Sequence, residues 1–219
     1  MAEYFDIFDA NLSPAAPFRE ERTQAHQKGL WHQTFDCWVV RRDPSGDKIV
    51  LQLRSALKDN HPNTLDISAS GHLLSGEQPL DGVREVEEEL GLMVDPKDLL
   101  YLGINKEAVD RAGYCVRHFS HTYFYETKCL LADYKPQQSE VDGLFELDIA
   151  EGLKLFSGEI TSVEATGVIR EGADYKPAKR RITTADMAAA EDRCEITKYY
   201  LKIFVLAGLY LKGHRPLAI

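Results

Sequence analysis

The sequence is poor in cysteine, and the few cysteines form no motif. Cys37, Cys115, Cys129 and Cys194 are widely separated among 219 residues, and no two of them form a CxxC pair. Each lies among apolar or strand-like neighbours. We therefore expect free, buried thiols rather than a cysteine framework.

Long hydrophobic runs are also absent. The most apolar tract, Tyr199 to Leu211, has 13 residues and includes Lys202. It is too short to span a bilayer and is typical of a core helix. The first residues, MAEYFDIFDANLSP, contain no basic segment followed by an apolar run, so no secretory signal is expected. These features predict a cytoplasmic protein with no membrane partner.

An excess of positive charge is missing as well. Lys and Arg number 26 against 35 Asp and Glu, which gives a net charge of -9. An acidic surface repels a phosphate backbone, and this argues against a nucleic acid polymer as partner. A small anionic substrate stays compatible, because a local basic pocket or bound cations can override the net sign.

The chain has enough hydrophobic residues, 44%, for one globular domain with an added terminal part. The local patterns predict strands first, helices between later strands, and a helical tail, hence a mixed α/β fold. A loop is expected over 11–17, a hairpin turn at 43–47, and a helical tail from Thr184 that stops at Gly213. The expected strands cover 3–8, 35–42, 48–54, 99–104, 117–130 and 144–147, and the expected helices cover 80–90 and 149–155.

A cluster of glutamates on the expected helix of residues 80–90 carries the chemistry. At about 100° per residue, Glu85, Glu88 and Glu89 fall within roughly one 100° arc, opposite the apolar residues. Clustered carboxylates repel one another unless a cation binds, and Mg²⁺ or Mn²⁺ prefers such hard oxygen ligands. Arg84, four residues before Glu88, is spaced to pair with it. The alternative interpretation is a solvated acidic surface.

The residues around this helix resemble the Nudix box, G-x5-E-x7-R-E-U-x-E-E-x-G-U, where U is aliphatic. The matching letters are Gly71-x5-Glu77 and Arg84-Glu85-Val86-x-Glu88-Glu89-x-Gly91-Leu92. Six residues rather than seven separate Glu77 from Arg84, which leaves the helix register intact but affects the placement of Glu77. The resemblance implies the Nudix fold, a mixed sheet sandwiched between helices. It also implies that Glu85, Glu88 and Glu89, with the Gly71 carbonyl, hold Mg²⁺ or Mn²⁺, and that Arg84 orients the glutamates.

Residues upstream resemble type I isopentenyl-diphosphate isomerase, which is itself a Nudix-fold enzyme. The pattern is Arg22-x3-His26, His32, Arg54-x3-Lys58-x3-Pro62 and Ser70-Gly71-His72. By this resemblance, Arg22, Arg54 and Lys58 hold a substrate diphosphate. The same resemblance implies that His26, His32, His72 and Glu140 contribute to a metal site.

Two departures from the isomerase favour hydrolysis. Ser70 stands where the isomerase has its catalytic cysteine, and a hydroxyl is a far poorer proton donor and acceptor near neutral pH. Gln138 replaces another metal-site carboxylate. The glutamate set of a hydrolase is complete, so we predict metal-assisted attack of water on a diphosphate linkage in a nucleotide-type or prenyl-type small molecule. Glu140 and a box glutamate are the alternative general bases.

Two other functions stay open: an isomerase that tolerates serine, and a Nudix domain that binds ligand with little turnover. For domain organisation, we predict a Nudix domain over 1–180 and a helical extension over 181–219. The apolar face of that extension either packs on the sheet or forms a homodimer interface. Its members are Ile196, Tyr199, Tyr200, Ile203, Phe204, Ala207 and Leu211.

Overall fold

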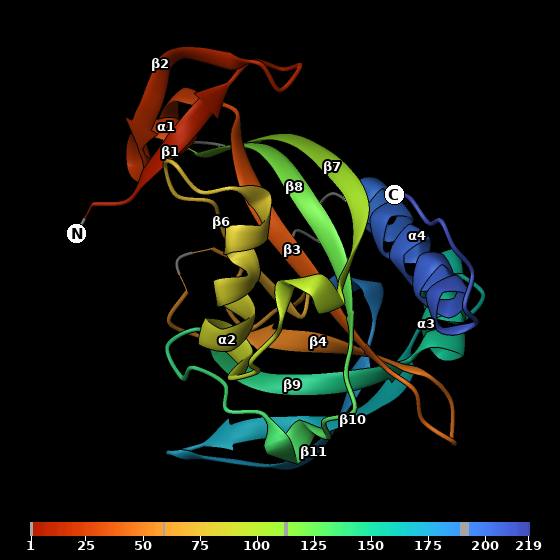
Figure 1. Cartoon of the computed structure of the whole chain (residues 1–219). Coiled ribbons are helices and arrows are strands. Elements are labelled where there is room, and N and C mark those ends of the chain that lie inside the picture. The colour runs from red at the N-terminus through yellow and green to blue at the C-terminus, as the bar shows by residue number, and fades with distance from the viewer. Residues whose placement is uncertain (1, 59, 112–113, 189–192) are drawn as a thin grey trace.

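A large mixed sheet organises the chain. The computed structural model describes residues 2–58, 60–111, 114–188 and 193–219 (Figure 1). In the sheet the strand order is β11-β10-β9-β4-β3-β8-β7, with β5 paired to β4 and β6 paired to β3. The β3–β8 pairing is parallel, and the other pairings are antiparallel. The strands are β3 (His32–Arg41), β4 (Lys48–Arg54), β5 (Leu65–Asp66), β6 (Ala69–His72), β7 (Leu99–Arg111), β8 (Tyr114–Glu126), β9 (Val141–Asp148), β10 (Val163–Glu171) and β11 (Asp174–Ile182).

The N-terminal residues form a small separate lobe, at the top of Figure 1. Strands β1 (Tyr4–Phe8) and β2 (Pro14–Glu21) pair antiparallel, and helix α1 (Arg22–Lys28) follows. The opening strand was predicted, but the loop predicted over 11–17 is wrong from Pro14 onward. Strand β2 pairs with β1 on one edge only, so its prolines can lie at the other edge without removing a backbone hydrogen bond of the sheet. Residues typical of turns are therefore tolerated in this strand.

One face of the large sheet is covered by helix α2 (Arg84–Leu90), which carries the glutamates. A 3-10 helix, η1 (Pro79–Val83), leads into it, so the predicted single helix over 80–90 has two segments. Val86 and Leu90 of α2 pack with Phe35 and Val39 of β3 in one hydrophobic cluster. With this packing Glu88 is exposed, whereas Glu89 is buried against Gln52 of β4 and Ser70 of β6.

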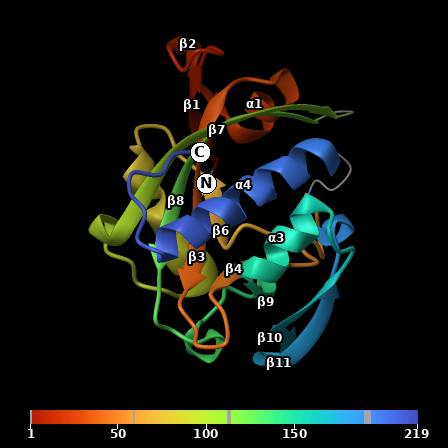
Figure 2. The ribbon, with the colours of Figure 1, turned by 90° about the vertical axis from the view of Figure 1, so that its right-hand side faces the viewer.

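The opposite face is covered by α3 (Ile149–Ser157) and α4 (Arg193–Leu211), which lie side by side in Figure 2. Phe204 and Tyr200 of α4 pack with Trp38 and Phe124 of the sheet in the main core. The predicted sandwich of sheet between helices is confirmed, and the tail packs on the core. Tyr200, Ile203, Phe204, Ala207 and Leu211 are all buried, whereas the side chain of Ile196 and that of Cys194 lie outside the described residues.

The helical tail begins later than predicted. Thr184–Asp186 forms only a 3-10 turn, η4, and α4 begins at Arg193; further 3-10 turns are η2 (Pro96–Asp98) and η3 (Leu131–Asp133). Gly213, with a φ of 84°, follows the helix as expected. None of the helices in the described ranges is long and apolar enough to cross a membrane.

Strands β10 and β11 form a hairpin that the local sequence patterns did not predict. Their residues are mixed in polarity, and β11 lies at the edge of the sheet. The basic run Lys179 to Arg181 lies on β11, where Arg180 pairs with Asp186 and Arg181 with Glu164. The boundary at residue 180 falls inside this strand; the division into domains itself stays a prediction.

Candidate active site

One large cavity brings the predicted site residues together. Its volume is about 1350 Å³, and it lies beside α2 and β6 and reaches as far as α4. Of the residues singled out from the sequence, those that line it are Arg22, His26, Arg54, Lys58, Gly71, His72, Arg84, Glu85, Glu88, Glu89 and Glu140. His32 is fully buried behind the wall. Segments far apart in the sequence thus converge on one site.

Arg84 organises the carboxylates of the box. Its Nη1 lies 2.5 Å from Glu85 Oε1 and 3.6 Å from Glu88 Oε2, and its Nε donates to Glu77 Oε1 at 3.0 Å. Glu77 also accepts from the backbone N–H of Leu74. The shortened spacing is therefore accommodated by the 3-10 turn η1, and Glu77 still reaches Arg84.

Position 71 has space only for glycine. A Cβ at this position would come within 2.0 Å of Glu85 Cδ, so any side chain would displace the Glu85 carboxylate. Residue 71 belongs to β6, which pairs with β3 through Phe35. The close approach of backbone to carboxylate explains a glycine here without reference to turn geometry.

Glu89 is the most buried carboxylate of the set, with 4% exposure. Its Oε2 accepts hydrogen bonds from Gln52 Nε2 and from the Ser70 backbone N–H, both at 3.0 Å. Burial raises the pKa of Glu89 to about 8 and also raises that of Glu85. The buried Glu89 and the partly buried Glu85, beside the exposed Glu88, form an environment that a divalent cation would stabilise.

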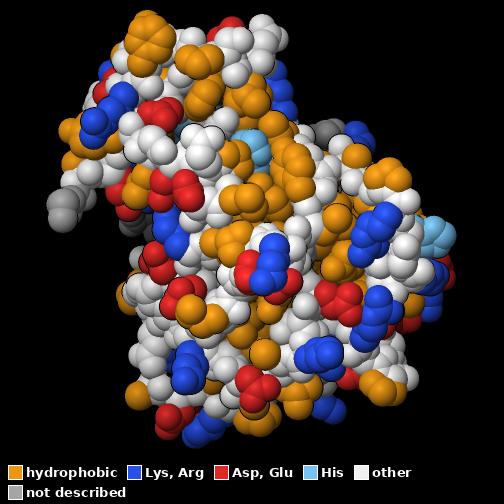
Figure 3. All heavy atoms as spheres, in the orientation of Figure 1, with side chains coloured by type: hydrophobic (Ala, Val, Ile, Leu, Met, Phe, Trp, Pro, Cys, Tyr) orange, Lys and Arg blue, Asp and Glu red, His pale blue; other side chains and the backbone are white. Residues whose placement is uncertain are grey.

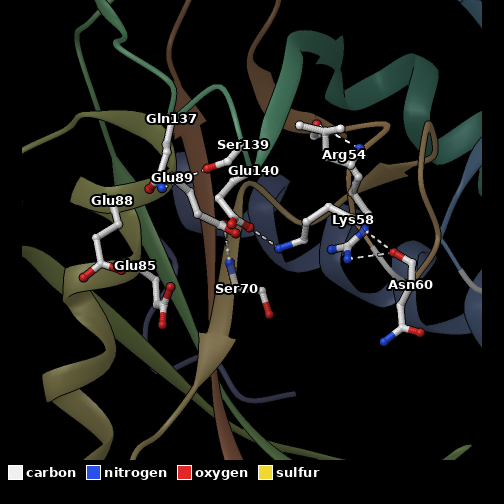
Figure 4. A network of polar contacts seen from close by, with 12 residues as sticks. Arg54, Lys58, Asn60, Ser70, Glu85, Glu88, Glu89, Gln137, Ser139 and Glu140 are labelled. Atoms are coloured by element: carbon white, nitrogen blue, oxygen red, sulfur yellow. Dashed lines mark hydrogen bonds and ion pairs between the residues drawn. The ribbon is translucent and has the colours of Figure 1, made fainter. Parts of the chain in front are cut away.

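The predicted diphosphate-binding cations line the same cavity, and each already has a partner. Figure 4 shows Lys58 facing Glu140 and Arg54 beside Asn60. Lys58 pairs with Glu140, and Arg54 bonds the carboxylate of Asp66 and the carbonyl of Asn60. Arg22 lies 2.6 Å from Glu3 and is half exposed. On binding, the oxygens of a substrate diphosphate would replace the protein oxygens that now accept hydrogen bonds from these cations.

Glu140 lies apart from the histidines with which the resemblance had grouped it. It directly precedes β9, and Ser55 donates its N–H to the Glu140 carbonyl. In the sheet, β4 separates β9 from β3, whereas the histidines gather beyond β3. Figure 4 shows Glu140 beside Glu89, with its carboxylate facing Lys58.

Four histidines form a compact group: His26 of α1, His32 of β3, His72 of β6 and His118 of β8. One ring nitrogen of each lies within 4.8 Å of the others. His32 Nδ1 contacts the Leu30 carbonyl at 2.8 Å, which assigns the proton to Nδ1 and leaves Nε2 as an acceptor. The Nε2 atoms of His32, His72 and His118 are buried without a hydrogen-bond partner.

Burial keeps this group neutral. It lowers the pKa of His32 to about 4 and holds the pKa values of His72 and His118 well below 6.5. Neutral imidazoles with unpartnered nitrogens fit the donor set of a transition metal ion. His118 was missed from the sequence; the available signal was its place in the alternating polar run His118, Ser120, Thr122 on a strand rich in aromatic residues.

Asp36 is the second residue that sequence analysis missed. It lies on β3, is 4% exposed, and accepts a 2.8 Å hydrogen bond from Ser70 Oγ. Ser70, the residue at the isomerase's cysteine position, thus connects two carboxyls, Asp36 through its side chain and Glu89 through its backbone. Burial raises the pKa of Asp36 to about 7.

The distribution of charge around this face is mixed. Figure 3 shows acidic and basic side chains interspersed over the face that α2 covers, without a broad patch of one sign. Recognition of an anion would depend on the few cations inside the cavity.

The sequence matches the NUDIX domain over residues 30–162. The chain belongs to the Nudix family. An uncharacterized Nudix hydrolase of Clostridium acetobutylicum is 40% identical over 179 residues, which are 81% of this chain and 86% of that protein. An uncharacterized Nudix hydrolase of Yersinia pestis is 38% identical over 91 residues, 41% of this chain and 47% of that protein.

Among solved structures, a protein of Deinococcus radiodurans superposes with a TM-score of 0.52 at 18% identity, over 71% of this chain and 90% of that one. A MutT/nudix family protein of Enterococcus faecalis gives a TM-score of 0.50 at 11% identity, over 83% and 67%. At these identities the likeness concerns the fold. The relatives named here support the superfamily, and the isomerase-like branch stays a prediction.

Proposed function

We propose that this protein hydrolyses a diphosphate linkage in a small molecule, of nucleotide or prenyl type, with Mg²⁺ or Mn²⁺. The observation that carries the proposal is the convergence of Glu85, Glu88 and Glu89 against Gly71, in a cavity that also contains Arg54 and Lys58. Glu89 is buried and Glu85 is partly buried, and burial raises the pKa of both; a bound cation would oppose this effect by stabilising the charged carboxylates.

The box residues would hold the ion, and each has a defined part. Glu85, Glu88 and Glu89 supply carboxylate oxygens, with the Gly71 carbonyl as a further oxygen. Arg84 keeps Glu85 and Glu88 in position. When bound, the metal offsets the negative charge of the diphosphate and lowers the pKa of water.

The reaction breaks one P–O bond. The oxygen of water adds to one phosphorus, the bond from that phosphorus to the bridging oxygen breaks, and two phosphate-bearing products leave. One proton of the water passes to a base, for which Glu140 and a box glutamate are the candidates. Arg22, Arg54 and Lys58 would hold the diphosphate oxygens through charge-assisted hydrogen bonds.

A second metal site is part of this proposal. His26, His32 and His72, joined by His118, form a nitrogen donor set that suits zinc, iron or cobalt better than magnesium. The two donor sets differ in chemistry, oxygen on α2 and nitrogen in the histidine group. Each would select its own ion.

The proposal is tested by measuring phosphate or phosphomonoester products from a panel of nucleoside diphosphate derivatives, dinucleotides and prenyl diphosphates, with Mg²⁺ or Mn²⁺. We expect hydrolysis of at least one member, and a loss of about 100-fold in Glu88→Gln, equal to about 2.7 kcal/mol of transition-state stabilisation. An allylic product from isopentenyl diphosphate without phosphate release would instead establish the isomerase. Unchanged turnover in Glu88→Gln would contradict the assignment of the box.

A further inference from the structure

The inner wall of the cavity is built from polar side chains, although it lies against the hydrophobic core. Five residues compose this polar floor, and all of them line the cavity: Thr34, Asp36, Ser70, Ser120 and Tyr199. Thr34 and Asp36 lie on β3, and the register pairs Asp36 with Ser70 of β6 and Thr34 with Ser120 of β8. Because side chains alternate between faces, these residues share the sheet face that α4 covers.

Asp36 has acceptor capacity that the protein does not use. Its Oδ1 accepts from Ser70 Oγ at 2.8 Å, and its Oδ2 has the Tyr199 hydroxyl at 3.5 Å, which is long for a hydrogen bond. A carboxylate offers about four lone pairs. Within the described parts of the chain, no Lys or Arg forms an ion pair with it. The position of Asp36 in the cavity wall therefore leaves room for donors from a ligand.

The electrostatics of the floor exclude the diphosphate itself. Asp66 and Glu107 add negative charge near Asp36 and contribute to raising its pKa. An anion is therefore disfavoured at Asp36 itself. Arg54, which pairs with Asp66, and Lys58 are the cations in the cavity that would bind it. The floor is left for the part of the substrate that carries no phosphate.

A single residue, Ser70, connects the polar floor with the glutamates of the Nudix box. Ser70 donates its backbone N–H to Glu89 and its hydroxyl to Asp36. Asp36 and Glu89 line the same cavity, so a substrate whose diphosphate lies at Glu89 can reach Asp36 with its non-phosphate part.

We propose that Asp36 is a specificity-determining residue that accepts hydrogen bonds from hydroxyl or N–H donors on the non-phosphate part of the substrate. This assignment rests on the proposed function and narrows its substrate class. Diphosphates that bear a polyol, sugar or nucleoside fit the floor. A hydrocarbon chain would displace water from Asp36 without donating a hydrogen bond in its place. The binding of prenyl diphosphates would therefore be weakened.

The test compares two probes of equal carbon number, ribitol 5-diphosphate and n-pentyl diphosphate. Their binding is measured by calorimetry on the full chain with Mg²⁺, in Glu88→Gln protein so that turnover is slow. With Asp36 intact, ribitol diphosphate should bind about 10- to 100-fold more tightly. Asp36→Leu, close in shape but apolar, should reduce this preference to less than about threefold.

Thr122→Val is the matched control. Thr122 is buried beside Asp36 in the β3–β8 register but does not line the cavity, so the preference should persist. Should Asp36→Leu not fold, Asp36→Asn keeps the shape and one acceptor and should lower the preference by about threefold to tenfold.

A preference that survives in Asp36→Leu, equal affinities, or no binding of either probe overturns the assignment. Failure of the proposed function has a different signature. In that case wild-type protein forms no phosphate or phosphomonoester product from any diphosphate, whatever the two affinities are.

Discussion

Gln52 donates a 3.0 Å hydrogen bond to Glu89, and this neutral amide is the side-chain partner that the buried carboxyl has. In the described ranges of the chain, no Lys or Arg lies within ion-pair distance of Glu89. A buried carboxyl with neutral partners favours its protonated form. The metal-free protein therefore has a predictable dependence on pH.

Metal-free stability should fall as pH rises. The pKa of Glu89 is about 8 in the folded protein, against 4.5 for an exposed glutamate. Between these values the folded state keeps a proton that the unfolded state has lost, so the free energy of unfolding decreases from about pH 4.5 to about 8. Asp36, with a pKa of about 7, acts in the same direction. Urea denaturation in EDTA at pH 5 and pH 8 measures the effect.

Glu89→Gln should flatten this slope, since glutamine carries no proton to lose. Glu87→Gln, at an exposed position on the same helix, is the control and should keep the wild-type slope. Mg²⁺ at pH 8 should raise the midpoint of wild-type protein and raise that of Glu89→Gln much less. A wild-type slope in Glu89→Gln would mean that other groups carry the pH dependence.

Arg84→Lys should lower kcat by about 10- to 100-fold with little change in KM for substrate. Lysine keeps the charge but not the planar fork that contacts Glu77 and Glu85 together. Steady-state kinetics at varied Mg²⁺ measure this, and the metal concentration for half-maximal rate should rise. If KM for substrate rises while kcat is kept, Arg84 binds substrate instead.

The histidine group should bind Co²⁺ with a visible d–d absorption spectrum. His118→Asn should weaken this binding by at least about tenfold, because one of four nitrogens is lost. His121→Asn is the control, since His121 is also buried but lies outside the group. Equal spectra from both variants would exclude His118 as a ligand.

Two glycines test the packing of α4 on the fold. A Cβ at Gly152 of α3 would come within 2.0 Å of Phe204 Cε1, so Gly152→Ala should destabilise the protein by about 1–3 kcal/mol. At Gly208 of α4 the corresponding contact is 3.6 Å from Ile149 Cγ2. Gly208→Ala should therefore stabilise the helix by about 0.5–1 kcal/mol. Thermal denaturation separates the two, and a stable Gly152→Ala would show that α4 packs less tightly on α3.

Most regular elements could be predicted locally, because their patterns are local. Strand β4 matches its prediction at both ends, and β1 lies within one residue of it. Helix α1 was not predicted although it is a local element, whereas the unpredicted strands depend on pairing at a distance. Strand β2, which contains Pro14 and Pro17, is extended because it pairs with β1. Strand β10, whose residues are mixed in polarity, is extended because it pairs with β9 and β11.

The sequence by itself determined the family and the glutamate helix. The Nudix box is contiguous, and helical geometry alone gathers Glu85, Glu88 and Glu89 on one side. Only the tertiary structure decided what surrounds that helix. Asp36 and Tyr199 are 163 residues apart and meet because α4 packs on the sheet. His118 meets His32 because β8 pairs with β3. Contacts of that kind cannot be predicted from residue spacing in the sequence, because they depend on which strands and helices become neighbours in the fold.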